Sequence, residues 1–105
     1  MKKLLTLLAV LCLFSPAGAF TAEEAETEHL RETQRYERRV FKQIKSEVKA
    51  GYTDSVSRLA ELYYHGRGTK KNYKKAYKYF KRASHYHAYA AYACSFMLMR
   101  GQGVK

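Results

Sequence analysis

Cysteine and proline are scarce in this sequence of 105 residues, and tryptophan is absent. The two cysteines are Cys12 and Cys94, and the single proline is Pro16. Because Cys12 lies in an N-terminal segment that we expect to be removed, Cys94 remains alone and no disulfide can form within the chain. The mature protein must therefore be held together by packing, and the lone thiol is best explained as a small buried hydrophobic group.

Acidic residues are also few beyond the first third of the chain. Residues 38–105 contain only Glu47, Asp54 and Glu61, against sixteen Lys and Arg. This leaves no paired carboxylates for general acid–base chemistry, and no motif for a serine or cysteine nucleophile is present. We therefore expect that the protein is not an enzyme.

Motifs for metals and cofactors are missing as well. His85, His87 and Cys94 do not have a recognised zinc spacing, and the two histidines would lie on different faces of a helix. The sequence Gly66-Arg67-Gly68 is too short for a phosphate-binding loop. We expect no metal and no cofactor.

The N-terminus has the features of a secretory signal peptide. Lys2 and Lys3 precede an apolar stretch, Leu4–Phe14, and the small residues Ala17-Gly18-Ala19 follow it. The apolar stretch is too short to cross about 30 Å of hydrocarbon as a helix, so cleavage after Ala19 is favoured over a membrane anchor. The sequence thus predicts a signal peptide at residues 1–19, an exported protein that is periplasmic or secreted, and no transmembrane segment after cleavage.

The rest of the chain has the periodicity of an all-α protein. Residues 20–28 are acidic and nearly devoid of large apolar residues, so we expect a flexible segment there. Apolar side chains at helical spacing then predict four helices, over residues 29–50, about 54–65, about 73–84 and about 87–100. The glycines near 51, 66 and 101 are natural helix stops.

An internal repeat is the most informative feature of the sequence. Gly66 and Gly68 recur 35 residues later as Gly101 and Gly103, and apolar positions precede both pairs. Two amphipathic helices in a unit of this length are typical of a helical solenoid, in which each unit buries its face against the next. The expected fold is a short α-solenoid of antiparallel helix hairpins.

The stretch from Ser55 to Ser84 resembles a Sel-1-like repeat, a relative of the tetratricopeptide repeats. The matching positions carry small residues, aromatic residues and the Gly-x-Gly loop of the family: Leu59, Ala60, Tyr63, Gly66, Gly68, Tyr73, Ala76, Phe80 and Ala83, with Gly101 and Gly103 in a second unit. The departures are mild, since Ala60 stands where the family has a glycine and Asn72 where it has an aspartate. The resemblance implies one repeat over residues 51–86 and a partial second repeat over residues 87–105.

What this resemblance implies about function is a protein-interaction scaffold with a protein partner. The matched residues all have structural roles, because small side chains let helices approach and large ones fill the space between them. The sequence does not identify the partner.

A basic helix face supports an alternative function. Residues 67–82 contain eight basic residues and no acid, and such a face attracts polyanions but is also a common solvated helix surface. We keep open an electrostatic binder of anionic glycolipid or surface polymer in the cell envelope, and consider nucleic acid an unlikely partner because the signal peptide exports the protein. The residues of this face are Lys70, Lys71, Lys74, Lys75, Lys78, Lys81 and Arg82.

The last expected helix is crowded with apolar residues. Phe96, Met97, Leu98 and Met99 are consecutive, and only some of them can face inward. Exposed apolar patches usually mark association surfaces, so this helix is expected to join a second copy of the chain or to receive the partner.

Overall fold

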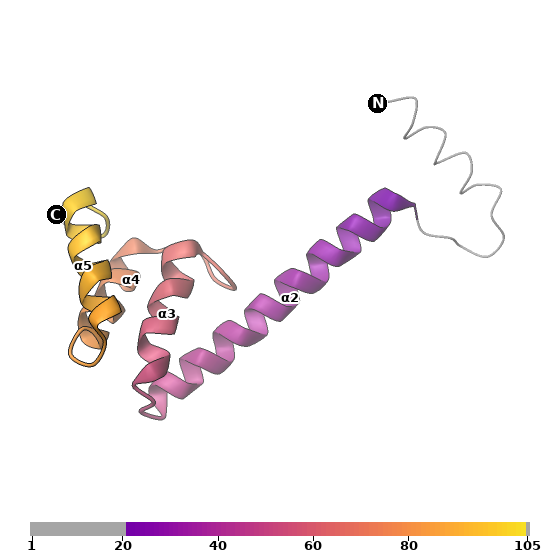
Figure 1. Ribbon diagram of the computed structural model, residues 1–105. Coiled ribbons are helices and arrows are strands. Elements are labelled where there is room, and N and C mark those ends of the chain that lie inside the picture. Colours follow the sequence, from indigo (N-terminus) through magenta and orange to yellow (C-terminus); the bar gives the residue numbers. More distant parts are fainter. Residues whose placement is uncertain (1–20, 105) are drawn as a thin grey trace. The chain divides into compact units, whose positions relative to one another are not determined.

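A computed structural model describes residues 21–104 of the chain, and the helix is its only regular element (Figure 1). The helices are α2 (Ala22–Lys49), α3 (Asp54–His65), α4 (Tyr73–Ala83) and α5 (Ala88–Arg100). The all-α class and the short helical solenoid are thereby confirmed. The predicted signal peptide, residues 1–19, lies outside the described residues. Within the described part, none of the helices is both long enough and apolar enough to cross a membrane.

The described residues fall into two units, 21–34 and 35–104. In the first unit, α2 begins at Ala22, so the residues expected to form a flexible acidic segment, 20–28, are mostly helical. The cause is a capping box, in which the Thr21 hydroxyl accepts a hydrogen bond from the Glu24 amide at 3.1 Å. The Glu24 carboxylate accepts one from the Thr21 amide at 3.4 Å. Each satisfies a donor that a helix start leaves unpaired.

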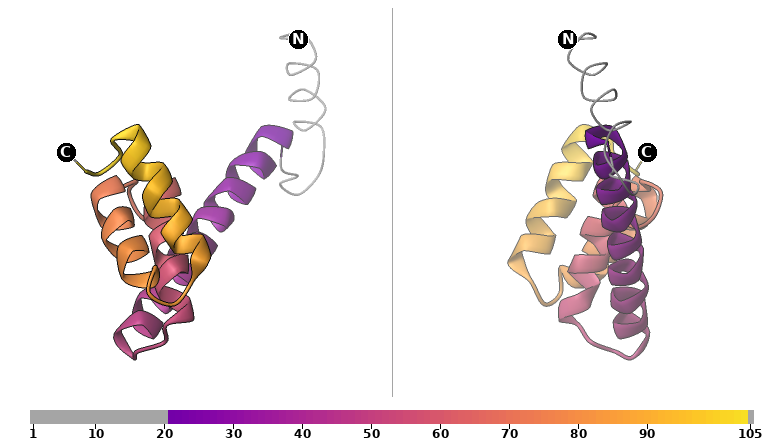
Figure 2. Two further views of the ribbon diagram at one scale, coloured as in Figure 1. Left: turned by 60° about the vertical axis from the view of Figure 1, so that its left-hand side comes forward. Right: turned by 90° about the vertical axis from the view of Figure 1, so that its right-hand side faces the viewer.

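The second unit is built on α3, which is buried along most of its length. Leu59 and Ala60 have no exposed surface, and Val56 and Tyr63 are at most 4% exposed. The helices α3, α4 and α5 pack side by side in order along the chain (Figure 2). The core continues into α4 and α5 and is completed by the C-terminal part of α2. Its remaining buried members are Ile44, Val48, Ala76, Phe80, Ala83, Ala90 and Met97.

Glycines end α3 and α5 in the same way. Gly66 and Gly101 have φ angles of 69° and 65°, a left-handed conformation that glycine adopts without steric cost. The amide of Arg67 then donates to the Leu62 carbonyl at 3.0 Å, and the amide of Gln102 donates to the Met97 carbonyl at 2.9 Å. Hydrogen bonds of this kind are typical of the Schellman motif. Because the two bonds are equivalent at an offset of 35 residues, the loops repeat in structure as well as in sequence.

The second glycine of each loop packs against the helix that precedes the hairpin. A Cβ atom at Gly68 would lie 2.8 Å from Cβ of Phe41 on α2 and would overlap the carbonyl of Glu37. A Cβ atom at Gly103 would lie 2.8 Å from the amide of Lys74 and would overlap the carbonyl of Tyr73 on α4. The C-terminal part of α2 therefore relates to α3 as α4 relates to α5. It occupies the place of the second helix of a preceding repeat.

Candidate functional site

A groove lies between α3 and α5 in the second unit and has a volume of about 240 Å³. Most of its lining is aromatic, and it holds one carboxylate. The lining residues are Glu61, Tyr64, His65, Phe80, Tyr89, Tyr92, Ala93, Phe96 and Met97. Such a hollow with a few polar groups is the usual form of a binding site.

Helical spacing brings these side chains to one side of each helix. On α5, Tyr89, Tyr92 and Phe96 are separated by three and four residues, which places them on one face. The lining of α3 comes from its last turn, at residues 61–65. Phe80 and Met97, exposed by only 2% and 1%, form the floor. The groove therefore has a rigid base and a rim of larger, more exposed side chains.

The rim consists of tyrosines that solvent can reach. Tyr89 is 54% exposed and Tyr92 is 68% exposed. The ring of Tyr89 lies edge-on to Phe80 with centroids 6.2 Å apart, and the ring of Tyr92 stacks on Phe96 at 6.4 Å. Aromatic pairs of this kind hold the rings in place while leaving their outer surface free.

The carboxylate of Glu61 influences the adjacent tyrosine. Partial burial raises the pKa of Tyr89 above its usual value, and the negative charge and hydrogen bonding of Glu61 raise this pKa further. The Tyr89 hydroxyl thus stays protonated at neutral pH and can donate a hydrogen bond. Glu61 itself has no Lys, Arg or His at ion-pair distance within the described residues.

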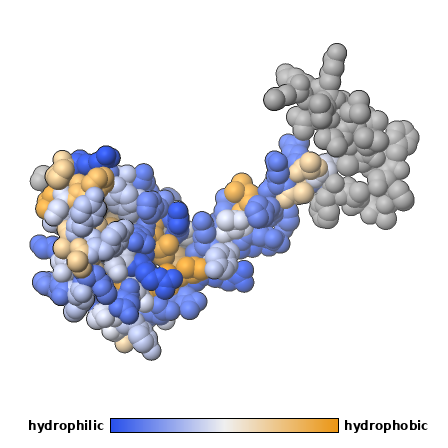
Figure 3. Space-filling model, viewed as in Figure 1, coloured by the Kyte–Doolittle hydropathy of each residue, from blue (hydrophilic) through white to orange (hydrophobic). Residues whose placement is uncertain are grey.

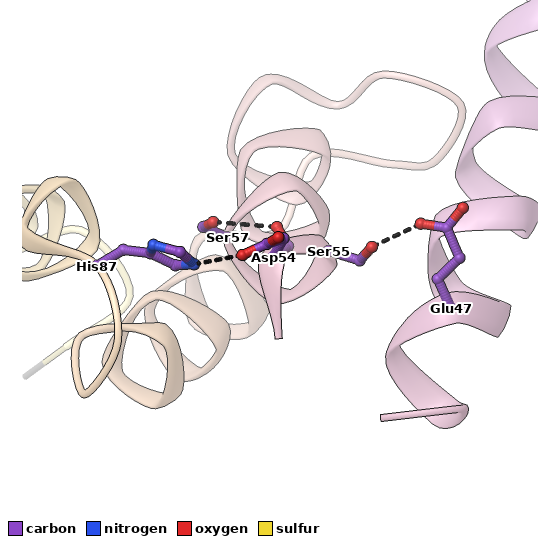
Figure 4. A network of polar contacts seen from close by, with 5 residues as sticks. All are labelled: Glu47, Asp54, Ser55, Ser57 and His87. Carbon is purple, nitrogen blue, oxygen red and sulfur yellow. Dashed lines mark hydrogen bonds and ion pairs between the residues drawn. The ribbon is translucent and has the colours of Figure 1, made fainter. Parts of the chain in front are cut away.

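The other two acids of the basic region are used within the fold, as Figure 4 shows. The hydroxyl of Ser55 donates to the carboxylate of Glu47 at 2.5 Å, which connects α3 to α2. This hydrogen bond is the main cause of the lowered pKa of Glu47. Asp54 lies 3.3 Å from Nε2 of His87, a distance suited to an ion pair, although the contact lacks hydrogen-bond geometry. The first contact joins α2 to α3, and the second lies between the start of α3 and the residue that precedes α5.

The residues that carry the repeat motif lie in and around the core. Leu59, Ala60, Tyr63, Ala76, Phe80 and Ala83 are buried, Tyr73 is half-buried, and Gly66, Gly68, Gly101 and Gly103 form the loops. Leu59 and Phe80 belong to the same hydrophobic cluster. These positions support the packing of the helices and, apart from Phe80, do not line the groove.

The structure separates the basic side chains that the sequence grouped together. Four of them line a shallow hollow beside Tyr77 and Gly103: Lys74, Lys75, Lys78 and Lys81. Lys70, Lys71 and Arg82 do not line it. The ammonium groups of Lys71 and Lys75 lie 4.9 Å and 5.4 Å from the ring centroids of Tyr73 and Tyr63, so part of this charge packs on the protein's own aromatic rings.

The outer face of α5 is apolar and exposed. Met99 is 84% exposed and Leu98 is 54% exposed, and apolar residues show at the surface over this helix (Figure 3). At the 35-residue offset Leu98 corresponds to Tyr63, which α4 helps to bury at 4% exposure. This face is the equivalent of the one that α3 presents to α4.

The groove was not predicted from the sequence. Tyr89 and Tyr92 had been assigned no role, and Glu61 had been counted only as one of three acids. The spacing of Tyr89, Tyr92 and Phe96 is the signal that could have indicated one aromatic face on α5. The structure does not bring His85, His87 and Cys94 together as a group of three potential metal ligands, and no such group occurs within residues 21–104.

Comparison with known families agrees with this architecture. The model of the Sel1 repeat matches residues 53–85, which span α3 and α4, and residues 88–105, which include α5. The search of curated proteins and the search of solved structures found no match. The chain belongs to the Sel1-repeat proteins, with one full repeat and a second, partial one.

Proposed function

We propose that this protein is an exported, non-enzymatic interaction module that holds a segment of a partner protein in the groove between α3 and α5. Sel1 repeats generally mediate protein–protein interactions, and the groove provides a concrete surface for one. The observation that carries the proposal is its exposed tyrosine rim over a buried floor. Tyrosine is enriched among the residues that contribute most to binding, because it buries a large ring at little entropic cost.

The role of the groove is tested by comparing two tyrosines of similar exposure. Tyr92 lies in the groove and is 68% exposed, whereas Tyr52 lies outside it and is 64% exposed. The unaltered chain is first used to capture proteins from an envelope fraction, and each captured protein is identified. The affinity of each identified partner for the unaltered chain and for the two variants is then measured separately. We expect Tyr92→Ala to weaken binding by about tenfold or more, as for a typical interface hot spot, and Tyr52→Ala to leave it unchanged. Equal binding by both variants would show that the groove is not the docking surface.

Export is supported by the signal-peptide pattern of residues 1–19. The N-terminal sequence of the protein recovered from the periplasm or the medium should begin at Phe20. An intact Met1 on the exported protein would contradict the proposal.

A second candidate function is binding of an anionic glycolipid or polymer at the lysine-lined hollow. Its support is the gathering of Lys74, Lys75, Lys78 and Lys81 around one surface depression. Charges interact over a screening length of about 8 Å at physiological ionic strength, and added salt shortens this length. Binding that depends on charge therefore weakens as the salt concentration rises. We therefore expect sedimentation with anionic vesicles to fall steeply with added salt if this function holds. Salt-insensitive sedimentation would exclude it.

A further inference from the structure

We infer that the groove between α3 and α5 receives an arginine side chain of the partner segment, held by Glu61 and the surrounding aromatic rings. This inference rests on the proposed function and adds the chemistry that the partner must present. The groove supplies a carboxylate and several aromatic faces in one place, which is the combination that attracts an organic cation.

The first support is the state of Glu61. It is half-buried and is the only acid lining this groove. The other acids of the basic region contact Ser55 and His87, but Glu61 has no basic side chain within ion-pair distance among the described residues. In a chain with twenty Lys and Arg against nine acids, an unpaired carboxylate facing a hollow is available to a ligand cation.

The second support is the distribution of the protein's own cation–π contacts. Within residues 21–104, basic groups lie over Phe41, Tyr63, Tyr73, Tyr79 and Phe96. The tyrosines of the groove have none. At its edge, the guanidinium of Arg100 lies 4.6 Å from the centroid of Phe96. A groove ring thus already accepts a guanidinium, while Tyr64, Tyr89 and Tyr92 carry no basic group of the described chain.

Arginine fits this arrangement better than other cations. Its planar guanidinium stacks on aromatic rings and pairs with a carboxylate in a fixed geometry, and it is less strongly hydrated than an ammonium group. A volume of about 240 Å³ is below the range of about 300–1,000 Å³ of drug-sized ligand pockets. The groove is therefore suited to one long side chain of a larger partner.

The positive charge of the protein does not prevent this contact. The lysines of the shallow hollow line a different surface from the groove, and the two share no lining residue. Glu61 is the only acid that lines the groove, and Arg100 lies over Phe96 at its edge. Charges farther away than about 8 Å are largely screened at physiological salt.

The test uses the full chain and three capped tripeptides, Gly-Arg-Gly, Gly-Lys-Gly and Gly-citrulline-Gly. Citrulline has the shape of arginine without its charge. Amide chemical shifts of the groove residues report binding, and a single side chain is expected to bind with a dissociation constant in the millimolar range. We expect the arginine probe to bind about fivefold or more tightly than the citrulline probe, and more tightly than the lysine probe.

The variants Glu61→Gln and Glu32→Gln separate the local charge from the net charge, since each removes one negative charge and Glu32 is exposed on α2, outside the groove. We expect Glu61→Gln to abolish the preference for arginine over citrulline and Glu32→Gln to retain it. Equal binding of these two probes, a lysine probe that binds as well as arginine, or no shift in the groove at tens of millimolar would overturn the inference. Loss of partner capture in Tyr92→Ala but not in Glu61→Gln would overturn it while leaving the proposed function standing.

Discussion

Substituting Gly68 with alanine tests whether α2 packs as the second helix of a preceding repeat. The added methyl group would overlap the backbone of Glu37 and lie 2.8 Å from Cβ of Phe41. Gly101 provides a matched control, because it has a similar φ angle, 65° against 73°, but nothing lies within 4 Å of its Cβ position. Both substitutions force alanine into left-handed backbone, and only Gly68→Ala also pushes α2 away from α3.

The two effects have different magnitudes. Left-handed backbone costs a residue with a Cβ atom about 1–2 kcal/mol, which is the full expected loss for Gly101→Ala. Overpacking adds about 1–3 kcal/mol, so Gly68→Ala should lose about 2–5 kcal/mol. Natural domains are stable by roughly 0.05–0.15 kcal/mol per residue, so the larger loss removes a substantial part of the total in a protein of this size.

Urea unfolding followed by circular dichroism measures both variants. With a slope near 1 kcal/mol per molar urea, Gly101→Ala should lower the midpoint by about 1–2 M and Gly68→Ala by clearly more. Hydrogen exchange over residues 35–49 should increase in Gly68→Ala alone. Equal midpoints for the two variants would refute the packing of Gly68 on α2 and, with it, the assignment of α2 to a preceding repeat.

Three further substitutions probe other parts of the second unit. Leu59→Ala removes a side chain with no exposed surface and should cost about 2–5 kcal/mol; an unchanged thermal midpoint would contradict its place in the core. The pKa of Glu47 is lowered in the fold, so its contribution to stability is present above pH 4.5 and is lost as the pH falls through the folded value. Ser55→Ala removes the main cause of this lowering and should flatten the loss of stability below pH 4.5, and an acid limb identical to that of the unaltered chain would count against it. Replacing Met99 with a polar residue should reduce self-association, measured by light scattering at fixed salt, more than Lys78→Gln does; a strictly monomeric unaltered protein would exclude this surface.

The sequence predicted the helices of the repeat closely because their boundaries depend on local chemistry. The expected span of 54–65 equals α3, and 73–84 exceeds α4 by one residue. Asn72 caps α4, since its side chain accepts a hydrogen bond from the Lys75 amide at 3.0 Å, and asparagine is among the residues preferred at this position. The start of α2 was placed too late because the capping box of Thr21 and Glu24 was overlooked.

Burial along α2 and the groove itself depend on contacts that a helical pattern does not contain. Helical spacing puts Leu30 and Tyr36 on the same side of the helix as Val40 and Ile44, yet Leu30 is 59% and Tyr36 is 63% exposed. A helical wheel gives the direction of a side chain, not whether a neighbouring helix reaches that turn. For the same reason, the sequence pattern did not show that Glu61 lies near tyrosines some thirty residues away. Only the folded repeat brings these side chains together.

The dependence of the groove on two separate helices has a consequence for its dynamics. One wall belongs to α3, whose Leu59 and Ala60 have no exposed surface, while the other belongs to α5, whose Leu98 and Met99 are open to solvent. Helices with fewer buried contacts open more often in native-state fluctuations, so α5 should detach more readily than α3. A partner segment bound between the two walls would hold α5 closed and raise its protection against exchange in proportion to the ligand concentration. Binding and the local folding of α5 are thus one linked equilibrium, and the measured affinity includes the free energy of closing the helix.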